Sequence, residues 1–206
     1  MNAKTSTTSY MPPEWAFEFH GHRCPAMPMG YRTAIAAMEK LGVEKAHDGQ
    51  LAALIELGED HCATCFGDGV QVATGCTFGK GNIKKLNYGK WGLTLIDKKN
   101  GKAVRVTPKA EAMMKSKQSE FMKMRKSGIP ASQVPASVAD PLVNFITTAK
   151  SEDILHIGEV FDYQWENAPD AFDGFICESC GEMTVTTYGR IKDGKHVCIP
   201  CSGYKK

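Results

Sequence analysis

The segment from residue 61 to residue 82, HCATCFGDGVQVATGCTFGKGN, restricts the possible folds of this chain more than any other. It carries three of the eight cysteines between closely spaced glycines, and it has few charged residues. Glycine costs backbone entropy inside a helix or strand, and proteins use it where the chain turns tightly or another group approaches closely. Cysteines in such surroundings are placed for chemistry at sulfur. We therefore expect this segment to line a pocket.

A second segment of similar chemical density is HGHRC, at residues 20–24. In extended backbone the side chains of His20, His22 and Cys24 would point to the same side, because side chains alternate along a strand. Two imidazoles and a thiolate suit a borderline-soft divalent metal, with zinc as the expected ion and iron, nickel or cobalt as alternatives. A fourth donor would come from one of three cysteines: Cys62, Cys65 or Cys76. We predict that the two segments share one metal ion with a partly open coordination shell.

Each segment also has an alternative interpretation. The histidines and the cysteine of residues 20–24 could be ordinary, hydrogen-bonded core residues without a metal. Cys62-x-x-Cys65 could form a redox pair, because this spacing is found in thiol oxidoreductases. Nothing else in the chain resembles the thioredoxin context, so a metal site is the favoured interpretation.

Polar residues follow the cysteines of the first segment. Asp68 and Gln71 lie three and six residues after Cys65. On a helical turn they would share its face, where they could orient a ligand or accept a proton. Lys80 would be either solvated or in contact with an anionic substrate. The surrounding TFGKGN lacks the spacing of a phosphate-binding loop, so no nucleotide cofactor is expected.

The C-terminal segment contains two Cys-x-x-Cys motifs on either side of a predicted β-hairpin. Their cysteines are Cys177, Cys180, Cys198 and Cys201. Four thiolates at this spacing predict a tetrahedral zinc site with no position left for a substrate, and two disulfides are the weaker alternative. So short a module cannot build a hydrophobic core, and the metal must therefore supply its folding free energy.

Charge and hydropathy exclude several classes of partner. The 206 residues carry a formal net charge of +2, with both signs mixed along the chain, so nucleic acid and anionic membranes are not expected partners. No apolar run approaches the roughly 20 residues of a bilayer span, and the first residues lack the apolar block of a signal peptide. We therefore expect a cytoplasmic protein, whose reduced thiols favour metal binding.

The hydrophobic pattern predicts helices and strands without a regular β-α-β rhythm, which favours an α+β fold. We expect helices over residues 14–19, 30–41, 108–127 and 142–149. We expect strands over residues 50–58, 91–97, 103–107 and 153–161. The second and third strands would form a hairpin at Asn100-Gly101. The helix over 108–127 would place methionines and Phe121 on one apolar stripe, which predicts a homodimer.

Three regions follow from these patterns. Residues 1–12 are small and polar and should form a flexible N-terminal arm. Residues 13–172 would form the α+β metal-binding core, and residues 173–206 the Cys₄ zinc finger, joined through a linker at 167–173.

Several motifs resemble the formylmethanofuran dehydrogenase E-subunit family. They are FHGHRCP at 19–25, GYR at 30–32, Cys65-x-x-Asp68-x-x-Gln71, TGCTFGKGN at 74–82, YGKWGLT at 88–94 and VRV at 104–106. The C-terminal CESCGE and CIPC are similar to the treble-clef zinc finger that some members carry. The resemblance implies an α+β core, commonly dimeric, with a metal-binding pocket. It also implies a link to the molybdenum or tungsten enzyme that fixes carbon dioxide onto methanofuran.

Carried over by position, the resemblance implies a set of functional residues. They are His20, His22, Cys24, Cys65, Asp68, Gln71, Cys76 and Lys80. Cys65 is the preferred fourth donor or substrate-facing thiol, because the family pattern places its cysteine there and Asp68 and Gln71 follow at helical spacing. Cys62 is a thiol beyond the usual pattern of the family, and it leaves open which cysteine completes the metal shell.

Two functions are compatible with these features. The first is a metalloprotein, either an enzyme or one component of an enzyme, whose His/Cys site binds or acts on a small one-carbon or sulfur-containing substrate, with the finger as a structural zinc module. The second is a non-catalytic accessory or metal-delivery protein that docks a molybdenum, tungsten or other redox enzyme through the finger. A zinc-finger nucleic-acid binder would need a basic stripe that the chain lacks.

Overall fold

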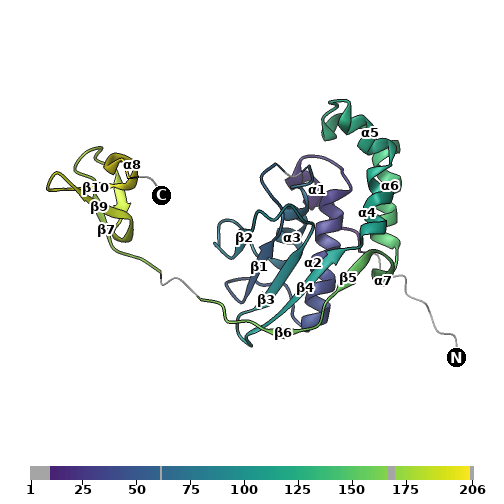
Figure 1. The fold of residues 1–206 in the computed structure, drawn as a ribbon, viewed down its shortest axis with the longest axis horizontal. Coiled ribbons are helices and arrows are strands. Elements are labelled where there is room, and N and C mark those ends of the chain that lie inside the picture. The colour runs from purple at the N-terminus through teal and green to yellow at the C-terminus, as the bar shows by residue number, and fades with distance from the viewer. Residues whose placement is uncertain (1–9, 61, 167–169, 205–206) are drawn as a thin grey trace. The chain divides into compact units, whose positions relative to one another are not determined.

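The computed structural model describes residues 10–60, 62–166 and 170–204. The predicted arm and linker therefore lie partly outside the described residues. The chain forms two compact units, which divide between Trp165 and Glu166 (Figure 1). No helix in the described parts of the chain is both long and apolar enough to cross a bilayer.

A mixed sheet organises the first unit. Its strand order is β2-β1-β3-β4-β5, with β6 also paired to β4, and only β1 and β2 run parallel. The strands are β1 Leu51–Ile55, β2 Ile83–Lys85, β3 Leu93–Asp97, β4 Lys102–Pro108, β5 Leu155–Ile157 and β6 Phe161–Asp162. The strand predicted at 50–58 and the predicted hairpin are present, and Gly101 takes a positive φ of 62° at the hairpin turn. The α+β prediction is confirmed.

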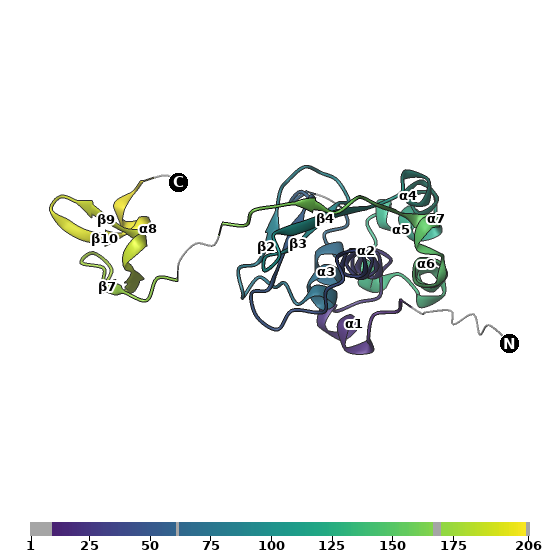
Figure 2. The same cartoon turned by 90° about the horizontal axis from the view of Figure 1, so that it is seen from below.

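Seven α-helices and one 3₁₀ helix, η1 Ala131–Gln133, accompany the described sheet of this unit. The α-helices are α1 Glu14–His20, α2 Ala26–Leu41, α3 Phe66–Thr74, α4 Ala110–Lys117, α5 Glu120–Lys126, α6 Ala136–Thr148 and α7 Ser151–Ile154. Figure 2 shows α2 and α3 against one side of the sheet, with α1 beyond them. In both views α4 to α7 gather at the side of the sheet where β5 lies.

Three predicted elements differ from the structure. The single helix expected over 108–127 is wrong, because Ser119 accepts a hydrogen bond from the Met122 amide (3.3 Å) and starts a new helix, α5. Helix α6 begins after Pro135, earlier than predicted, and tolerates Pro141 inside it. The strand expected over 153–161 is instead the end of α7, the short β5 and the beginning of β6.

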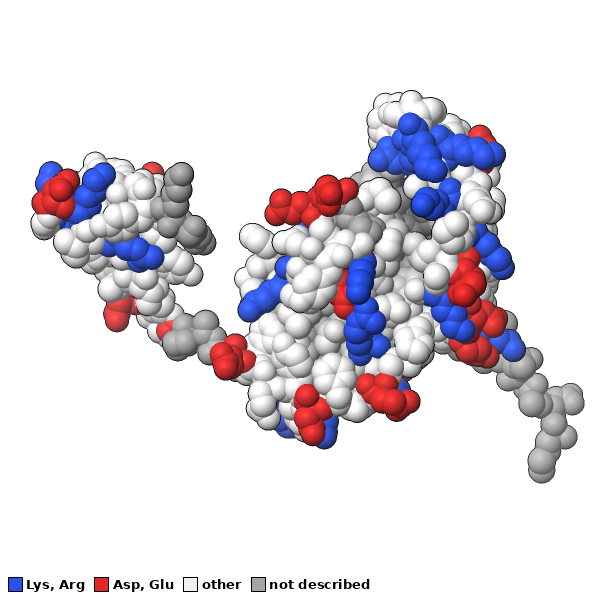
Figure 3. All heavy atoms as spheres, in the orientation of Figure 1, with Lys and Arg blue, Asp and Glu red and all other residues white. Residues whose placement is uncertain are grey.

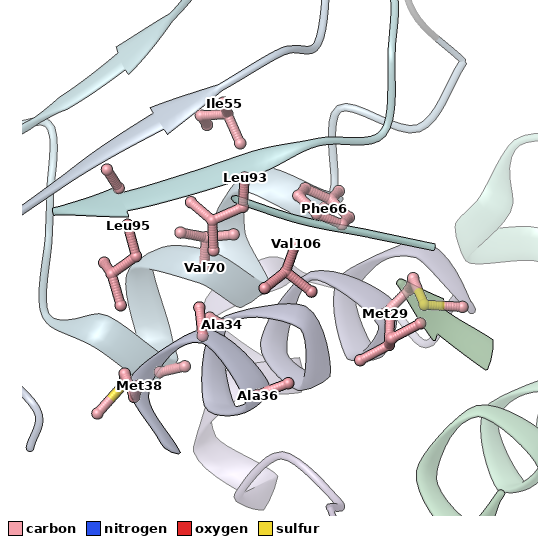
Figure 4. Packing of buried hydrophobic residues seen from close by; sticks show 14 of the residues in the cluster. Met29, Ala34, Ala36, Met38, Ile55, Phe66, Val70, Leu93, Leu95 and Val106 are labelled. Atoms are coloured by element: carbon pink, nitrogen blue, oxygen red, sulfur yellow. The ribbon is translucent and has the colours of Figure 1, made fainter. Parts of the chain in front are cut away.

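The main core fills the space between α2, α3 and the sheet. Small residues of α2, such as Ala34, bring this helix close to the strands, and Phe66 and Val70 of α3 point toward Leu93 and Val106 (Figure 4). These side chains are buried. Burial of such aliphatic and aromatic groups is the main favourable term for folding.

Two glycines let α2 and α3 approach more closely than side chains would allow. A Cβ added at Gly69 would lie 2.0 Å from the Met27 carbonyl oxygen, and one at Gly30 would lie 1.9 Å from the Phe66 carbonyl oxygen. Both distances are far below van der Waals contact. This close approach places the beginning of α3 beside the beginning of α2.

We expect Gly69→Ala to destabilise the first unit, because the added methyl group forces α2 and α3 apart. Overpacking of this kind costs about 1–3 kcal/mol. Urea unfolding of both proteins at equal metal content measures the change. Gly79→Ala is the matched control, since a Cβ at Gly79 would meet nothing within 4 Å. Equal unfolding midpoints for Gly69→Ala and the parent protein would contradict this account of the helix pair.

Arg32 joins α2 to the end of α6. Its side chain is fully buried, and it donates hydrogen bonds to the carbonyl oxygens of Ile146 and Ala149. The guanidinium carbon of Arg32 lies over the Tyr10 ring, 4.3 Å from the centroid of that ring. Carbonyl groups at a helix C-terminus lack partners within the helix, so a buried arginine is a suitable donor there. Arg32 thereby holds α6 in place beside α2.

The second unit consists of two hairpins, the 3₁₀ helix η2 Thr186–Tyr188 and a short α-helix. Its other elements are β7 Gly174–Ile176, β8 Met183–Val185, β9 Gly189–Lys192, β10 Lys195–Cys198 and α8 Ile199–Ser202. Strand β7 pairs with β8, and β9 pairs with β10 around Asp193-Gly194. The hydrophobic residues buried here are few, namely Cys177, Val197 and Cys198.

Candidate metal centre

Four donor side chains from both predicted segments meet in the first unit. His20, His22, Cys24 and Cys65 each offer one ligand atom, and these four atoms lie within 4.8 Å of one another. We call these four residues the core donor group. The two segments therefore face each other, although 41 positions of the chain separate Cys24 from Cys65.

The backbone at residues 20–24 differs from the predicted extended structure. Helix α1 continues through His20 and ends at Gly21, whose φ of 87° is the left-handed conformation that glycine adopts without strain. This turn, and not strand alternation, brings His20 back toward Cys24. Cys24 precedes the beginning of α2, and Cys65 occupies the N-cap position of α3. The close packing of α2 and α3 thus places Cys65 opposite the histidines.

The distances between donors suit a tetrahedral metal. His20 Nε2 lies 3.5 Å from Cys24 Sγ, and His22 Nε2 lies 4.0 Å from Cys65 Sγ. Zinc bonds of about 2.1 Å to nitrogen and 2.3 Å to sulfur would place neighbouring donors roughly 3.6 Å apart. Two imidazole nitrogens and two sulfurs therefore fit zinc in both number and spacing.

Asp68 and Gln71 form a hydrogen-bonded chain behind His20. Asp68 Oδ2 lies 2.7 Å from His20 Nδ1, and Gln71 Nε2 donates to Asp68 Oδ1 at 3.1 Å. The second nitrogen of His20, Nε2, therefore faces the core donor group. A carboxylate behind a histidine fixes its tautomer and raises its basicity, which is the usual arrangement around metal-binding histidines.

The surroundings shift the pKa values of three donors. The hydrogen bond with Asp68, and then that with Cys65, raise the pKa of His20 to about 9. A hydrogen bond with Cys24, together with His20, lowers the pKa of the Cys65 thiol, whereas the shared bond and burial raise the pKa of Cys24. Metal binding must displace the proton from His20. Metal affinity should therefore increase as the pH rises toward 9.

A pocket of about 930 Å³ opens beside the core donor group. His22, Cys24 and Cys65 line it, and its other walls come from Trp91, α4, α5 and the beginning of the α5–α6 connection. The walls are mostly apolar and include the methionines Met29, Met113, Met114 and Met122. The volume lies within the usual range of small-molecule sites. Three of the four donors can therefore be reached from a cavity large enough for a ligand.

Three other predicted site residues lie outside the core donor group. Cys62 is exposed and lines the pocket. Cys76 is fully buried in the main core between the sheet and the helices. Lys80 is exposed, does not line the pocket, and donates a hydrogen bond to the His47 carbonyl oxygen at 3.0 Å.

Sequence reasoning missed most of the pocket wall. Met113, Phe121 and Arg125 belong to the region that the family motifs do not cover. Trp91 lies inside the YGKWGLT motif, and its place in a family motif is the one sequence feature that could have indicated this part of the pocket wall. The sequence pattern places Phe121 on a dimer-forming stripe, but its side chain is buried within the chain.

The second unit brings its four cysteines together. The sulfurs of Cys177, Cys180, Cys198 and Cys201 lie within 4.8 Å of one another, and we call these residues the finger cluster. The Cys198 amide donates a hydrogen bond to Cys177 Sγ at 3.3 Å. Amides of Cys180 and Cys198 lower the pKa of the Cys177 thiol to about 6, which favours the thiolate that a metal needs. The cluster is compatible with a structural zinc ion.

Comparison with known proteins assigns the chain to a family. The family model described as "FmdE, Molybdenum formylmethanofuran dehydrogenase operon" matches residues 19–156. A curated relative from Archaeoglobus fulgidus, named "Probable S-adenosyl-L-methionine-binding protein", is 36% identical over 199 residues, which cover 91% of this chain and 51% of the relative. The chain thus spans about half the length of that relative.

A solved structure shares the fold. It is that of a tungsten formylmethanofuran dehydrogenase FmdE-like protein from Syntrophus aciditrophicus, with a TM-score of 0.59 and 23% identity, covering 91% of this chain and 88% of that one. The family model includes the whole core donor group and most of the first unit. The chain therefore belongs to the FmdE family.

Proposed function

We propose that the chain is a metalloprotein whose core donor group holds a divalent ion, zinc before iron or nickel, at the edge of a small-ligand pocket. The observation that carries this proposal is the convergence of two nitrogens and two sulfurs within 4.8 Å, three of them on residues that line the pocket. Such an ion would act as a Lewis acid on a carbonyl group, or lower the pKa of a bound thiol or water.

The residues have distinct roles in this proposal. His20, His22 and Cys24 hold the ion, and Asp68 orients His20 from behind. Cys65 is the fourth donor. A ligand in the pocket would reach the ion from the side of Cys65, which lines the pocket. Released from the ion, the Cys65 sulfur would face the pocket as a thiolate placed to accept a proton from the ligand.

The comparisons support a ligand of the one-carbon or sulfur-containing class. S-adenosylmethionine, which the name of the A. fulgidus relative mentions, carries both a sulfur and a transferable methyl group. The family description also supports a partner of the molybdenum or tungsten enzyme class. We propose both the ligand class and the partner class for this chain.

Cobalt substitution tests whether the core position is exchangeable. We expect 2-mercaptoethanol, but not ethylene glycol, to change the visible absorption of Co²⁺ in the core donor group, because a thiolate joins the coordination shell. The spectrum of a His22→Ala/Cys24→Ser variant, which retains cobalt in the finger cluster alone, is subtracted to isolate the core signal. An unchanged core spectrum at saturating thiol would show a closed, structural site and reject the proposed role.

A second candidate is an accessory protein that docks a redox enzyme through the finger. The second unit favours it, since several large apolar side chains are exposed there: Phe172, Ile176, Met183 and Ile191. As part of this candidate we propose that the second unit is a treble-clef zinc finger. The two hairpins and the following helix, which carries Cys201, support this. An accessory protein needs no exchangeable position in the core, so the cobalt experiment separates the two candidates.

A homodimer is also part of the proposal. Phe121 is buried within the chain, so it does not support an exposed apolar stripe. Met114 on α4 is half-exposed and is available for contact with a second copy. Sedimentation velocity at micromolar concentration measures the oligomeric state directly.

A further inference from the structure

The pocket beside the core donor group has one charged wall. Three of its lining residues carry a permanent positive charge, namely Lys117 at the end of α4 and Arg125 and Lys126 at the end of α5. No aspartate or glutamate of the described chain lines the pocket. Figure 3 shows lysine and arginine side chains gathered over α5. The wall formed by α4 and α5 therefore carries three positive charges with no aspartate or glutamate in the described lining to neutralise them.

These three cations have no acidic partner in the described structure. None of them belongs to an ion pair, whereas Lys123 on the same helix α5 pairs with Glu120 at 3.2 Å. Arg125 donates one hydrogen bond to the Ile129 carbonyl oxygen at 2.6 Å, which holds its guanidinium in place. Its other donors remain available for an acidic group.

The rest of the pocket is apolar and adaptable. Methionine side chains from α2, α4 and α5 join Trp91 and Phe121 in its walls. Methionine is flexible and polarizable, so such walls accommodate a flat or irregular apolar body. The cations lie on α4 and α5, whereas the donors lie at the end of α1, in the α1–α2 connection and at the N-cap of α3. The two kinds of polar group thus come from different walls.

We propose that the pocket binds a small molecule with an apolar body and an acidic end group, a carboxylate, sulfonate or phosphate, which Lys117, Arg125 and Lys126 hold. The acidic group is bound by α4 and α5, so the other end of the molecule is directed toward the core donor group. This inference rests on the proposed function only in taking this pocket as the ligand site. Lys80, the lysine that the sequence suggested for an anion, is outside the pocket.

A pair of fluorescent probes isolates the acidic group. 8-Anilinonaphthalene-1-sulfonate and N-phenyl-1-naphthylamine share the same aromatic body, and only the first carries a sulfonate. Neither probe needs a metal. We expect Lys117→Gln/Arg125→Gln/Lys126→Gln to weaken binding of the sulfonate probe by about tenfold or more, because charge-assisted hydrogen bonds are lost, and to leave the neutral probe within about twofold.

The matched control removes the same charge outside the pocket. Lys115→Gln/Lys123→Gln/Lys150→Gln changes three exposed lysines, none of which lines the pocket. We expect this variant to bind both probes as the parent protein does. Added potassium chloride should weaken binding of the sulfonate probe to the parent and to the control, but much less to the pocket variant.

Two results would overturn the inference. If both probes lose affinity equally in the pocket variant, the three residues support the wall and do not recognise an acidic group. If the control variant loses as much affinity for the sulfonate probe as the pocket variant, general charge attraction explains the binding. Either result can occur while the cobalt response to thiol is intact, so failure here is distinguishable from failure of the proposed function.

Discussion

Replacing Cys198 with serine is expected to remove one zinc ion per chain and to unfold the second unit, while the first unit stays folded. The physical reason is the small core of this unit, in which only Cys177, Val197 and Cys198 are buried among the described hydrophobic residues. Binding of structural zinc supplies about 10–16 kcal/mol in modules of this kind, far more than such a core can contribute. Cys177→Ser should have the same effect.

Metal analysis together with hydrogen exchange of the backbone amides measures this effect. Protection should disappear in β7 to β10 and remain in the sheet of the first unit. Ser179→Ala is the control, because Ser179 lies exposed between two of the cysteines and its side chain is not one of the candidate metal ligands. If the second unit of Cys198→Ser keeps its protected amides without zinc, the metal is not what folds it.

Replacing His22 with alanine is expected to remove the metal of the core donor group and to leave the finger cluster loaded. Three donors hold zinc less tightly than four, and the lost imidazole nitrogen lies 4.0 Å from the Cys65 sulfur that would share the ion. After mild chelation the metal content should fall from about two ions per chain to about one.

The two cysteines of the Cys62-x-x-Cys65 motif should differ in the same assay. Cys65→Ser removes a member of the core donor group, whereas Cys62→Ser changes an exposed residue outside it. We expect Cys65→Ser to lower metal retention strongly and Cys62→Ser to leave it unchanged. Retention in the parent protein should improve as the pH rises toward 9, because His20 then loses its proton. If His22→Ala retains as much metal as the parent, these residues do not share a site.

Short-range sequence patterns predicted the parts of the structure that neighbouring residues control. The hairpin of β3 and β4 follows from Asn100-Gly101, because few residues other than glycine accept the positive φ of its turn. The finger cluster follows from its two Cys-x-x-Cys motifs, since that spacing itself brings two sulfurs to one metal. The histidine–cysteine segment was identified from its composition, although the turn at Gly21, not an extended strand, arranges it.

Long-range packing controlled what the sequence analysis missed. The break between α4 and α5 is the exception, because the cap at Ser119 is a local feature that composition alone did not reveal. No local sequence pattern predicts that Arg32 is fully buried, where it donates hydrogen bonds to carbonyl groups at the end of α6. The charged wall of the pocket depends on the positions of α4 and α5 in the fold, and no local sequence pattern predicts those positions.

The types and local spacing of the candidate metal donors can therefore be read directly from the amino-acid order, because a few residues of backbone leave little freedom. The position of Cys65 opposite the histidines, in place of Cys62 or Cys76, does not follow from local spacing, and the sequence favoured Cys65 only through the family resemblance and the residues that follow it. This position depends on the close packing of α2 and α3, which Gly30 and Gly69 allow, across a separation of 43 residues between His22 and Cys65. Over such a separation the chain has many possible closures, and burial of the core between the helices and the sheet selects one of them.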